Sequence, residues 1–281
     1  MNYRHAFHAG NFADCLKHAA LVAVLLHLRK KQTPFAVIDT HGGRGLYDIA
    51  GEEAKKTGEA EAGIKRLLRA PSVPGVLDLY RECVRGFGEG AYPGSPLIAS
   101  KFLRPQDRLI AIEKHPEEQA ALSAALAHEK RVRVVQGDYV RELPRFLPPP
   151  ERRGVVLIDP PYEAEDEFAR ATRTLLAAHA RFATGIFLFW YPAKERALVG
   201  ASAGELLNAG IASLLRVELD VGAPEEKREE TRERLSAAGL LIVNPPFGFA
   251  GEMQRIMPFL ERHLAQGTGA RGLVRSFTST Q

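Results

Sequence analysis

The stretch Gly154-Val-Val-Leu-Ile-Asp-Pro-Pro-Tyr162 combines a short apolar run with an abrupt polar stop. A continuous run of β-branched and aliphatic residues is typical of a strand that is buried on both faces of a parallel sheet. Pro160 and Pro161 fix φ and lack amide donors, so the strand has to end at Asp159 and the loop after it is stiff. We therefore expect Asp159 at the carboxyl end of a buried strand.

Similar runs lie on both sides of this stretch, separated by segments with apolar residues at helical spacing. They predict further strands at residues 35–39, 108–113, 132–136, 185–190, 214–220 and 240–244. The predicted helices cover residues 116–128, 163–180, 193–208 and 251–265. Alternating strands and helices imply an α/β protein with a mostly parallel, seven-stranded sheet that is flanked by helices.

One interval interrupts this alternation. Glu113 ends the second strand 74 positions after Asp39 ends the first, whereas about 20 residues separate the corresponding positions of nucleotide-binding folds. Helical patterns at residues 58–68 and 76–87 lie inside the interval. We interpret residues 49–92 as a helical insertion subdomain and residues 1–48 and 93–281 as the main domain. The alternative is that the interval hides a further strand.

The composition is that of a globular protein. The 281 residues are 45% hydrophobic and 26% charged, and a net charge of +4 permits an acidic partner such as nucleic acid without requiring one. Cys15 and Cys83 are too few for a disulfide framework. The apolar run at residues 19–28 is too short to cross a bilayer, and the first residues lack the layout of a signal peptide. We expect a cytoplasmic protein with no membrane contact.

Three further acidic residues follow predicted strands. Asp39 opens Asp39-Thr-His-Gly-Gly-Arg-Gly45, whose glycines allow positive φ and close approach of a ligand. Glu113 stands where a carboxylate commonly accepts from ribose hydroxyl groups, and Asp138 can accept from an adenine amino group. A carboxylate at the head of the glycine loop favours a cationic ligand such as S-adenosylmethionine over a bare pyrophosphate. The alternatives are a tight turn without ligand, a solvated Glu113, and a helix cap at Asp138.

The Asp159-Pro-Pro-Tyr162 turn suits chemistry on an aromatic amine. The Asp159 carboxylate and the Pro160 carbonyl can both accept from an exocyclic amine, which frees the nitrogen lone pair from the ring. Tyr162 can stack on the base, a contact worth about 1–3 kcal/mol in single-stranded nucleic-acid sites. Asn244-Pro-Pro-Phe247 has a similar pattern, but it follows the last predicted strand. We interpret this second segment as a structural stop or a rim element.

The first residues interleave basic and aromatic side chains. Tyr3, Arg4 and His5 precede a predicted helix that includes Lys17 and His18. This mixture suits single-stranded RNA, in which bases stack and phosphates pair with cations. The alternative is a helix whose aromatic residues pack on the sheet. The histidines have no spacing typical of a metal site, so we expect no metal.

Several of these segments together resemble the bacterial 23S ribosomal RNA adenine-N6 methyltransferases of the J type. They are residues 3–18, residues 39–45, Tyr92-Pro-Gly-Ser-Pro96 and residues 159–162, and the likeness extends over nearly the whole chain. The resemblance implies a Rossmann-like class I methyltransferase. It also implies transfer of a methyl group from S-adenosylmethionine to N6 of an unpaired or flipped adenine in 23S rRNA, by a protein that we expect to be a monomer.

Motifs and resemblance together give a set of expected site residues. Catalysis is assigned to Asp159, Pro160 and Tyr162. Contacts to RNA are assigned to Tyr3, Arg4 and His5. The residues expected to bind the cofactor are Lys17, His18, Asp39, His41, Gly43, Ser95, Glu113, Asp138 and Tyr139. Tyr139 stands where the family pattern has glycine, so only its backbone contact carries over.

Two alternative functions remain open from the sequence. A DNA adenine-N6 or cytosine-N4 methyltransferase would carry the same Asp-Pro-Pro-Tyr tetrad. A non-catalytic nucleic-acid-binding protein on the same fold would not need the tetrad, and its presence here together with Asp39 argues against that alternative. Binding to single-stranded RNA and inertness toward duplex DNA would separate the first alternative from the main hypothesis.

Overall fold

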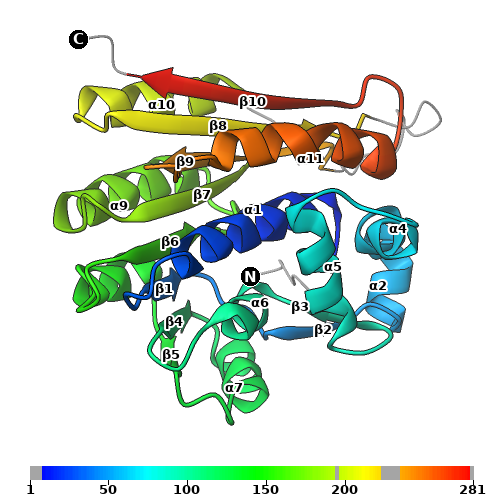
Figure 1. Cartoon of the computed structure of the whole chain (residues 1–281), viewed down its shortest axis with the longest axis horizontal. Helices are drawn as coiled ribbons and strands as arrows, with labels where there is room; N and C mark the ends of the chain where they lie inside the picture. The colour runs from blue at the N-terminus through cyan, green and yellow to red at the C-terminus, as the bar shows by residue number, and fades with distance from the viewer. Residues whose placement is uncertain (1–7, 194–195, 223–234, 279–281) are drawn as a thin grey trace.

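The computed structural model describes residues 8–193, 196–222 and 235–278. Its main feature is an eight-stranded sheet with the order β10-β8-β9-β7-β6-β1-β4-β5 and helices on both faces (Figure 1). Strands β1, β4, β5, β6 and β7 run parallel, whereas β9 is antiparallel to β7 and β8, and β10 is antiparallel to β8. The strands are β1 (Ala36–Asp39), β4 (Arg108–Glu113), β5 (Val132–Gln136), β6 (Gly154–Ile158), β7 (Ile186–Pro192), β8 (Ser213–Asp220), β9 (Ala237–Val243) and β10 (Arg271–Thr278).

All seven predicted strands are present, and β10 is an eighth that the sequence analysis missed. It lies at the edge of the sheet beside β8. Its sequence, Arg-Gly-Leu-Val-Arg-Ser-Phe-Thr, mixes polar and apolar residues, and the side chains of residues 271–277 are partly or fully exposed. An edge strand of this kind lacks the continuous apolar run by which the buried strands were recognised.

Two helical layers cover the sheet. Alternate residues of β1 point to opposite cores, since Val37 packs in the first core and Ile38 in the second. The first core lies under α1 (Phe12–Arg29), α6 (Ser95–Phe102) and α11 (Phe249–Leu264), with α7 (Pro116–Ala125) packed beside α6. The second core lies under α8 (Tyr139–Glu142), the 3-10 helix Leu143–Phe146, α9 (Glu167–Arg181) and α10 (Arg196–Asn208). None of the helices that the structure describes is long and apolar enough to cross a bilayer.

The interval between β1 and β4 is mostly helical. It contains α2 (Glu52–Thr57), α3 (Glu59–Ala62), α4 (Ile64–Arg69) and α5 (Val76–Arg85), enclosed by the short antiparallel pair β2 (Leu46–Asp48) and β3 (Ala91–Pro93). These two strands form a sheet of their own and do not join the main sheet. Ile64, Leu67 and Tyr80 lie in the same core as α1. The insertion therefore shares the hydrophobic core of the main domain.

The two similar turns, Asp159-Pro-Pro-Tyr162 and Asn244-Pro-Pro-Phe247, lie on opposite sides of the sheet because the strands before them run in opposite directions. The carboxyl ends of β1, β4, β5 and β6 meet at one edge of the sheet, which brings Asp39, Glu113, Asp138 and Asp159 together. Because β9 is antiparallel to β7, Asn244-Pro-Pro-Phe247 follows β9 at the opposite side of the sheet, where the parallel strands begin. The second segment is thus far from the expected catalytic turn.

Candidate active site

Asp159 begins a rigid turn directly after β6. Pro160 is buried, and Tyr162 adopts a left-handed conformation with φ of 52°. The Tyr162 hydroxyl donates a hydrogen bond of 2.6 Å to the backbone carbonyl of Trp190 on β7, and the two rings lie 5.7 Å apart. Neighbouring strands therefore fix both ends of the turn, and the position of the Asp159 carboxylate with it.

Asp159 is paired with a buried lysine of α1. Lys17 Nζ lies 2.5 Å from Asp159 Oδ2 and 2.8 Å from Asp14 Oδ1. Burial alone would lower the pKa of Lys17, but the Asp14 and Asp159 carboxylates outweigh it and raise that pKa above its usual range. Lys17 is thus a permanent cation in direct contact with the Asp159 carboxylate. The sequence assigned Lys17 to the cofactor, whereas the structure places its ammonium group on the expected catalytic carboxylate.

Asp39 is almost completely buried beside this pair. Its carboxylate accepts from the backbone amide of His41 at 3.1 Å and from the hydroxyl of Ser95, at the start of α6. Burial, together with repulsion from Asp159, raises the pKa of Asp39 to about 6, in spite of these hydrogen bonds and of Lys17. A carboxylate whose charge is disfavoured in this way would be stabilised by a cationic ligand group.

The glycine loop is tied to the end of β4. Gly43 has a φ of 58°, and its amide donates to Glu113 Oε2 at 2.8 Å, while the amide of His115 donates to Glu113 Oε1 at 2.8 Å. A Cβ at Gly43 would collide with the Tyr47 hydroxyl, so the turn requires glycine. Glu113 is only 7% exposed, so its alternative interpretation as a solvated surface carboxylate is wrong.

Asp138 is held by cations after β5. It caps α8 by accepting from the Val140 amide at 3.0 Å, as the capping alternative predicted. Both of its carboxylate oxygens also accept from Arg170, at 2.7 and 2.6 Å, and Lys114 Nζ lies 3.3 Å away. Burial opposes ionisation of Asp138, but Arg170, the Val140 amide and Lys114 together lower its pKa.

His41 and Tyr139 form an aromatic pair beside Asp138. Their ring centroids are 4.5 Å apart, and the Tyr139 hydroxyl donates to Glu167 at 3.0 Å. Desolvation lowers the pKa of His41 to about 3, with smaller contributions from nearby cations, so its ring is neutral at physiological pH. A neutral aromatic pair of this kind is suited to contact with a heteroaromatic base.

His18 is joined to the insertion by a chain of buried hydroxyl groups. His18 Nδ1 lies 2.7 Å from the Tyr92 hydroxyl on β3, and that hydroxyl lies 2.8 Å from the Tyr80 hydroxyl on α5. All three side chains are almost completely buried. Sequence reasoning found His18 but missed both tyrosines, although Tyr92 begins the Tyr-Pro-Gly-Ser-Pro motif that contains Ser95.

The structure thus gathers the expected catalytic and cofactor residues at one edge of the sheet. Tyr3, Arg4 and His5, which the sequence assigned to RNA, lie outside the described residues. Within the described ranges, no group of three or more His, Cys, Asp or Glu side chains is placed to hold a metal ion.

Comparison with known proteins identifies the family. The family model described as "Ribosomal RNA large subunit methyltransferase D, RlmJ" matches residues 32–275. The chain belongs to the RlmJ family. Two curated proteins named "Ribosomal RNA large subunit methyltransferase J" are similar to it over 96% of its length and 96% of theirs. The protein from Escherichia coli K12 is 37% identical over 274 residues, and that from Haemophilus influenzae is 37% identical over 276 residues.

A solved structure supports the fold of this RlmJ-family chain. Protein LPL1258 from Legionella pneumophila is 31% identical and superimposes with a TM-score of 0.85, over 98% of this chain and 99% of that one. The fold is that of a Rossmann-like class I methyltransferase, as the sequence predicted. The likeness covers the insertion as well as the main sheet.

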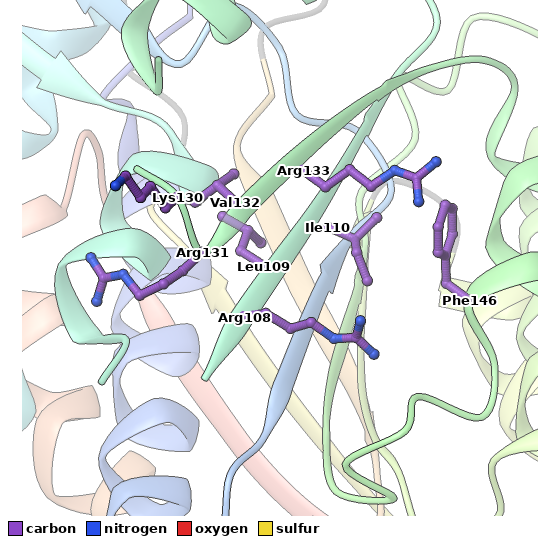
Figure 2. A pocket seen from close by; sticks show the side chains of 8 residues that line it. All are labelled: Arg108, Leu109, Ile110, Lys130, Arg131, Val132, Arg133 and Phe146. Carbon is purple, nitrogen blue, oxygen red and sulfur yellow. The ribbon is translucent and has the colours of Figure 1, made fainter. Parts of the chain in front are cut away.

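In this RlmJ fold, a cavity of about 200 Å³ lies where the parallel strands begin, on the side of the sheet opposite to the candidate active site (Figure 2). It is lined by side chains from the amino-terminal ends of β4 and β5, among them Arg108, Arg131 and Arg133, together with Phe146. Arg108 donates to Glu151 at 3.0 Å, and Arg131 is paired with Glu129. This cavity is separate from the strand ends that carry Asp39 and Asp159.

Proposed function

We propose that this protein transfers a methyl group from S-adenosylmethionine to the exocyclic N6 of an adenine in large-subunit (23S) ribosomal RNA. The RlmJ family and the fold make it a methyltransferase, a class that uses this cofactor. The observation that carries the assignment to an amine is the rigid Asp159-Pro-Pro-Tyr162 turn, with its carboxylate held by Lys17 beside Asp39.

The residues at the strand ends fit S-adenosylmethionine. Its methionine ammonium and its sulfonium are cationic, and burial destabilises the charged form of the Asp39 carboxylate. Glu113 and the Gly43 turn are suited to a ribose, and the His41–Tyr139 pair with Asp138 is suited to an adenine. We also assign Lys17, His18 and Ser95 to the cofactor-binding residues. The cofactor supplies an electrophilic methyl group when bound.

The chain's own part in the reaction is to orient and polarise the target amine. Lys17 holds Asp159 Oδ2, and in the described part of the chain no hydrogen bond reaches Oδ1. We assign Oδ1 and the Pro160 carbonyl as the acceptors for the two N–H bonds of the adenine amine. Two acceptors favour a pyramidal nitrogen with a free lone pair, and orientation supplies much of the rate enhancement. Tyr162, half-buried against Trp190, would face the ring of the base.

The adenine has to leave any base stack to reach this turn. An enzyme that acts on a base edge works on single-stranded nucleic acid or flips the nucleotide out of a helix. We infer that the target is unpaired or flipped, and that Tyr3, Arg4 and His5 contact the RNA around it. We further infer that the protein acts as a monomer in the cytoplasm, where ribosomal RNA is made.

Labelled S-adenosylmethionine and unmodified 23S rRNA, followed by nucleoside analysis, test the proposal. Wild type should yield N6-methyladenosine and should leave duplex DNA unmodified. Asp159→Ala and Asp159→Asn should lower turnover by about 100-fold or more, since the amine loses a charged acceptor. Both variants should bind S-adenosylmethionine within a few-fold of wild type.

Glu165→Gln is a matched control, because Glu165 is an exposed carboxylate in the same connection to α9. It should keep full turnover. Thermal melting of the two Asp159 variants separates lost chemistry from lost folding, since Lys17 loses one of its two partners in them. Unchanged turnover in Asp159→Ala would eliminate the proposed amine clamp, and equal methylation of duplex DNA would overturn the choice of RNA.

A further inference from the structure

Phe247 is 97% exposed on a loop that is held rigidly. Asn244, at the start of the loop, has a left-handed φ of 53°, and its side chain donates to the carbonyls of Ala183 and Gly185 at 2.8 Å each. Two prolines follow, and the Phe249 amide closes the loop on the Pro246 carbonyl at 3.0 Å. A phenylalanine ring that stands in water on a stiff loop presents a preformed apolar contact surface.

A groove of about 310 Å³ runs from this loop along α1. Its walls are the second half of α1, the start of α5 and the start of α11, three helices that lie on the same face of the sheet (Figure 1). Leu79 on α5 is 41% exposed in this groove. Its polar lining includes His27 of α1, Lys30, which directly follows α1, and Arg255 of α11.

The groove is lined by two cations, Lys30 and Arg255, by the histidine His27 and by one acid, Glu252. Burial lowers the pKa of His27, and the cations Lys30, Arg153 and Lys31 lower it further. His27 Nδ1 is buried without a hydrogen-bond partner among the described residues. The acid in the lining is Glu252, which already accepts from the Val76 amide at 2.8 Å and is paired with Arg255. Lys30 and Arg255 against Glu252 leave the lining with a net charge of +1, which favours an anionic ligand.

We propose that this groove is a second RNA-binding site, in which an unpaired base stacks on Phe247 while Lys30 and Arg255 pair with backbone phosphates. An exposed aromatic ring among cations is the arrangement that binds single-stranded RNA. This proposal rests on the proposed function in one respect, namely that the substrate is RNA.

The position of the groove indicates which part of the RNA it takes. Lys17 contacts Asp159 from within α1, and Lys30 caps the end of the same helix thirteen residues later, so the two are about 20 Å apart. A stacked strand with a rise of about 3.4 Å needs at least about six nucleotides for that distance, since residues 12–22 of α1 are buried and the strand has to pass around them. The groove therefore receives nucleotides that flank the target adenine.

Steady-state kinetics on RNA of two lengths test this site. Phe247→Ala should raise KM for an RNA that extends ten nucleotides on each side of the adenine by about 5- to 140-fold, the range expected for one lost stacking contact. Its kcat and its affinity for S-adenosylmethionine should stay at wild-type values. On an RNA that extends only two nucleotides, Phe247→Ala and wild type should have the same KM. Phe247→Trp should keep the low KM, and RNA should quench the added indole fluorescence relative to wild type, which has Trp190 alone.

The matched controls are Leu198→Ala, an exposed apolar residue on α10, and Arg173→Ala, an exposed cation on α9. Both lie on the other face of the sheet and should leave KM unchanged, whereas Lys30→Ala should raise it. An unchanged KM in Phe247→Ala with intact wild-type turnover would overturn the second site and leave the proposed function standing. Absence of wild-type turnover on any RNA would contradict the proposed function instead. A dimer that Phe247→Ala converts to monomers, with no effect on RNA, would make this surface a protein interface and also overturn the proposal.

Discussion

At the scale of single residues, the site holds two neighbouring carboxylates in opposite electrostatic environments. Asp159 shares the permanent cation Lys17 with Asp14, whereas Asp39 is buried and its charge is disfavoured. Under the proposed function, Asp159 accepts from the target amine, whereas Asp39 faces a cationic group of the cofactor. The cofactor proposed here supplies that cation, so its binding is expected to be coupled to the ionisation of Asp39.

The raised pKa of Asp39 predicts how the stability of the fold depends on pH. The pKa of Asp39 is about 6 in the folded protein and 3.8 ordinarily, so between these values the folded state binds more protons than the unfolded state. The free energy of unfolding therefore falls as pH rises through that window, by up to about 3 kcal/mol. Asp39→Asn cannot ionise, so its stability relative to wild type should increase between pH 4 and pH 7.

Urea unfolding at several pH values measures this difference, because the other titrating groups are common to both proteins. Saturating S-adenosylmethionine should reduce the pH dependence of wild type, since a cation next to Asp39 lowers its pKa. A stability difference between the two proteins that stays constant from pH 4 to pH 7 would show that Asp39 ionises normally in the fold.

The candidate site residues that could be predicted from the sequence are those that directly follow or end an apolar run. Asp39, Glu113 and Asp159 each end an apolar run, and parallel strands place such ends at one edge. The Lys17–Asp159 pair could not be found in this way, because 142 residues separate its partners. Its only local signal is the spacing of Asp14 and Lys17, three residues apart on a helix that is otherwise mostly apolar. Charges at that spacing in a buried helix indicate a polar network.

At the scale of elements, α1 connects the site to the insertion. Lys17 on this helix reaches Asp159, and His18 next to it reaches Tyr92 and, through Tyr92, Tyr80. The elements were predictable where the sequence has a continuous apolar run, as in β1, β4 and β6, or an apolar helical segment, as in α1. The pair β2 and β3 could not be predicted, because each has three residues and depends on the other for its hydrogen bonds.

The buried hydroxyl chain should couple these elements energetically. Tyr92→Phe removes the hydroxyl that bonds both His18 and Tyr80, so the free energy of unfolding should fall by about 1–3 kcal/mol. Tyr80→Phe in the Tyr92→Phe background should cost less than in wild type, by at least about 0.5 kcal/mol. Denaturant unfolding of the two single variants and the double variant gives this coupling.

Tyr139→Phe is the control for the coupling, because its hydroxyl bonds Glu167 in the other core. Tyr92→Phe and Tyr139→Phe should be additive within about 0.5 kcal/mol. Additivity of Tyr92→Phe and Tyr80→Phe as well would mean that the chain of hydroxyl groups carries no joint stabilisation. A fall in affinity for S-adenosylmethionine in Tyr92→Phe alone would support a contact of His18 with the cofactor.

At the scale of the whole molecule, the question is whether residues 49–92 form a unit that the main domain can lose. The gap between predicted strands located this interval, but sequence spacing carries no information about which core its helices share. Ile64, Leu67 and Tyr80 pack against α1, and the Ile64 amide donates to the Gly10 carbonyl at 2.8 Å. These contacts argue that the insertion completes the main core.

Replacing residues 49–90 by an Asn-Gly turn tests this argument. The turn is matched to the local structure, because Asp48 and Ala91 are paired in the β2–β3 ladder and a two-residue turn can join them. The deletion removes several large buried side chains, each worth about 1.5–3 kcal/mol, from a fold whose total stability is about 5–15 kcal/mol. We therefore expect no cooperative thermal transition and no binding of S-adenosylmethionine. Two glycines inserted after Gly58, where an added Cβ would meet no atom of the described residues within 4 Å, should leave both properties intact and control for a change in loop length. A shortened protein that unfolds cooperatively and binds the cofactor would instead establish residues 1–48 and 93–281 as a self-sufficient domain, because α1 would then have kept its place on the sheet without the helices that cover it.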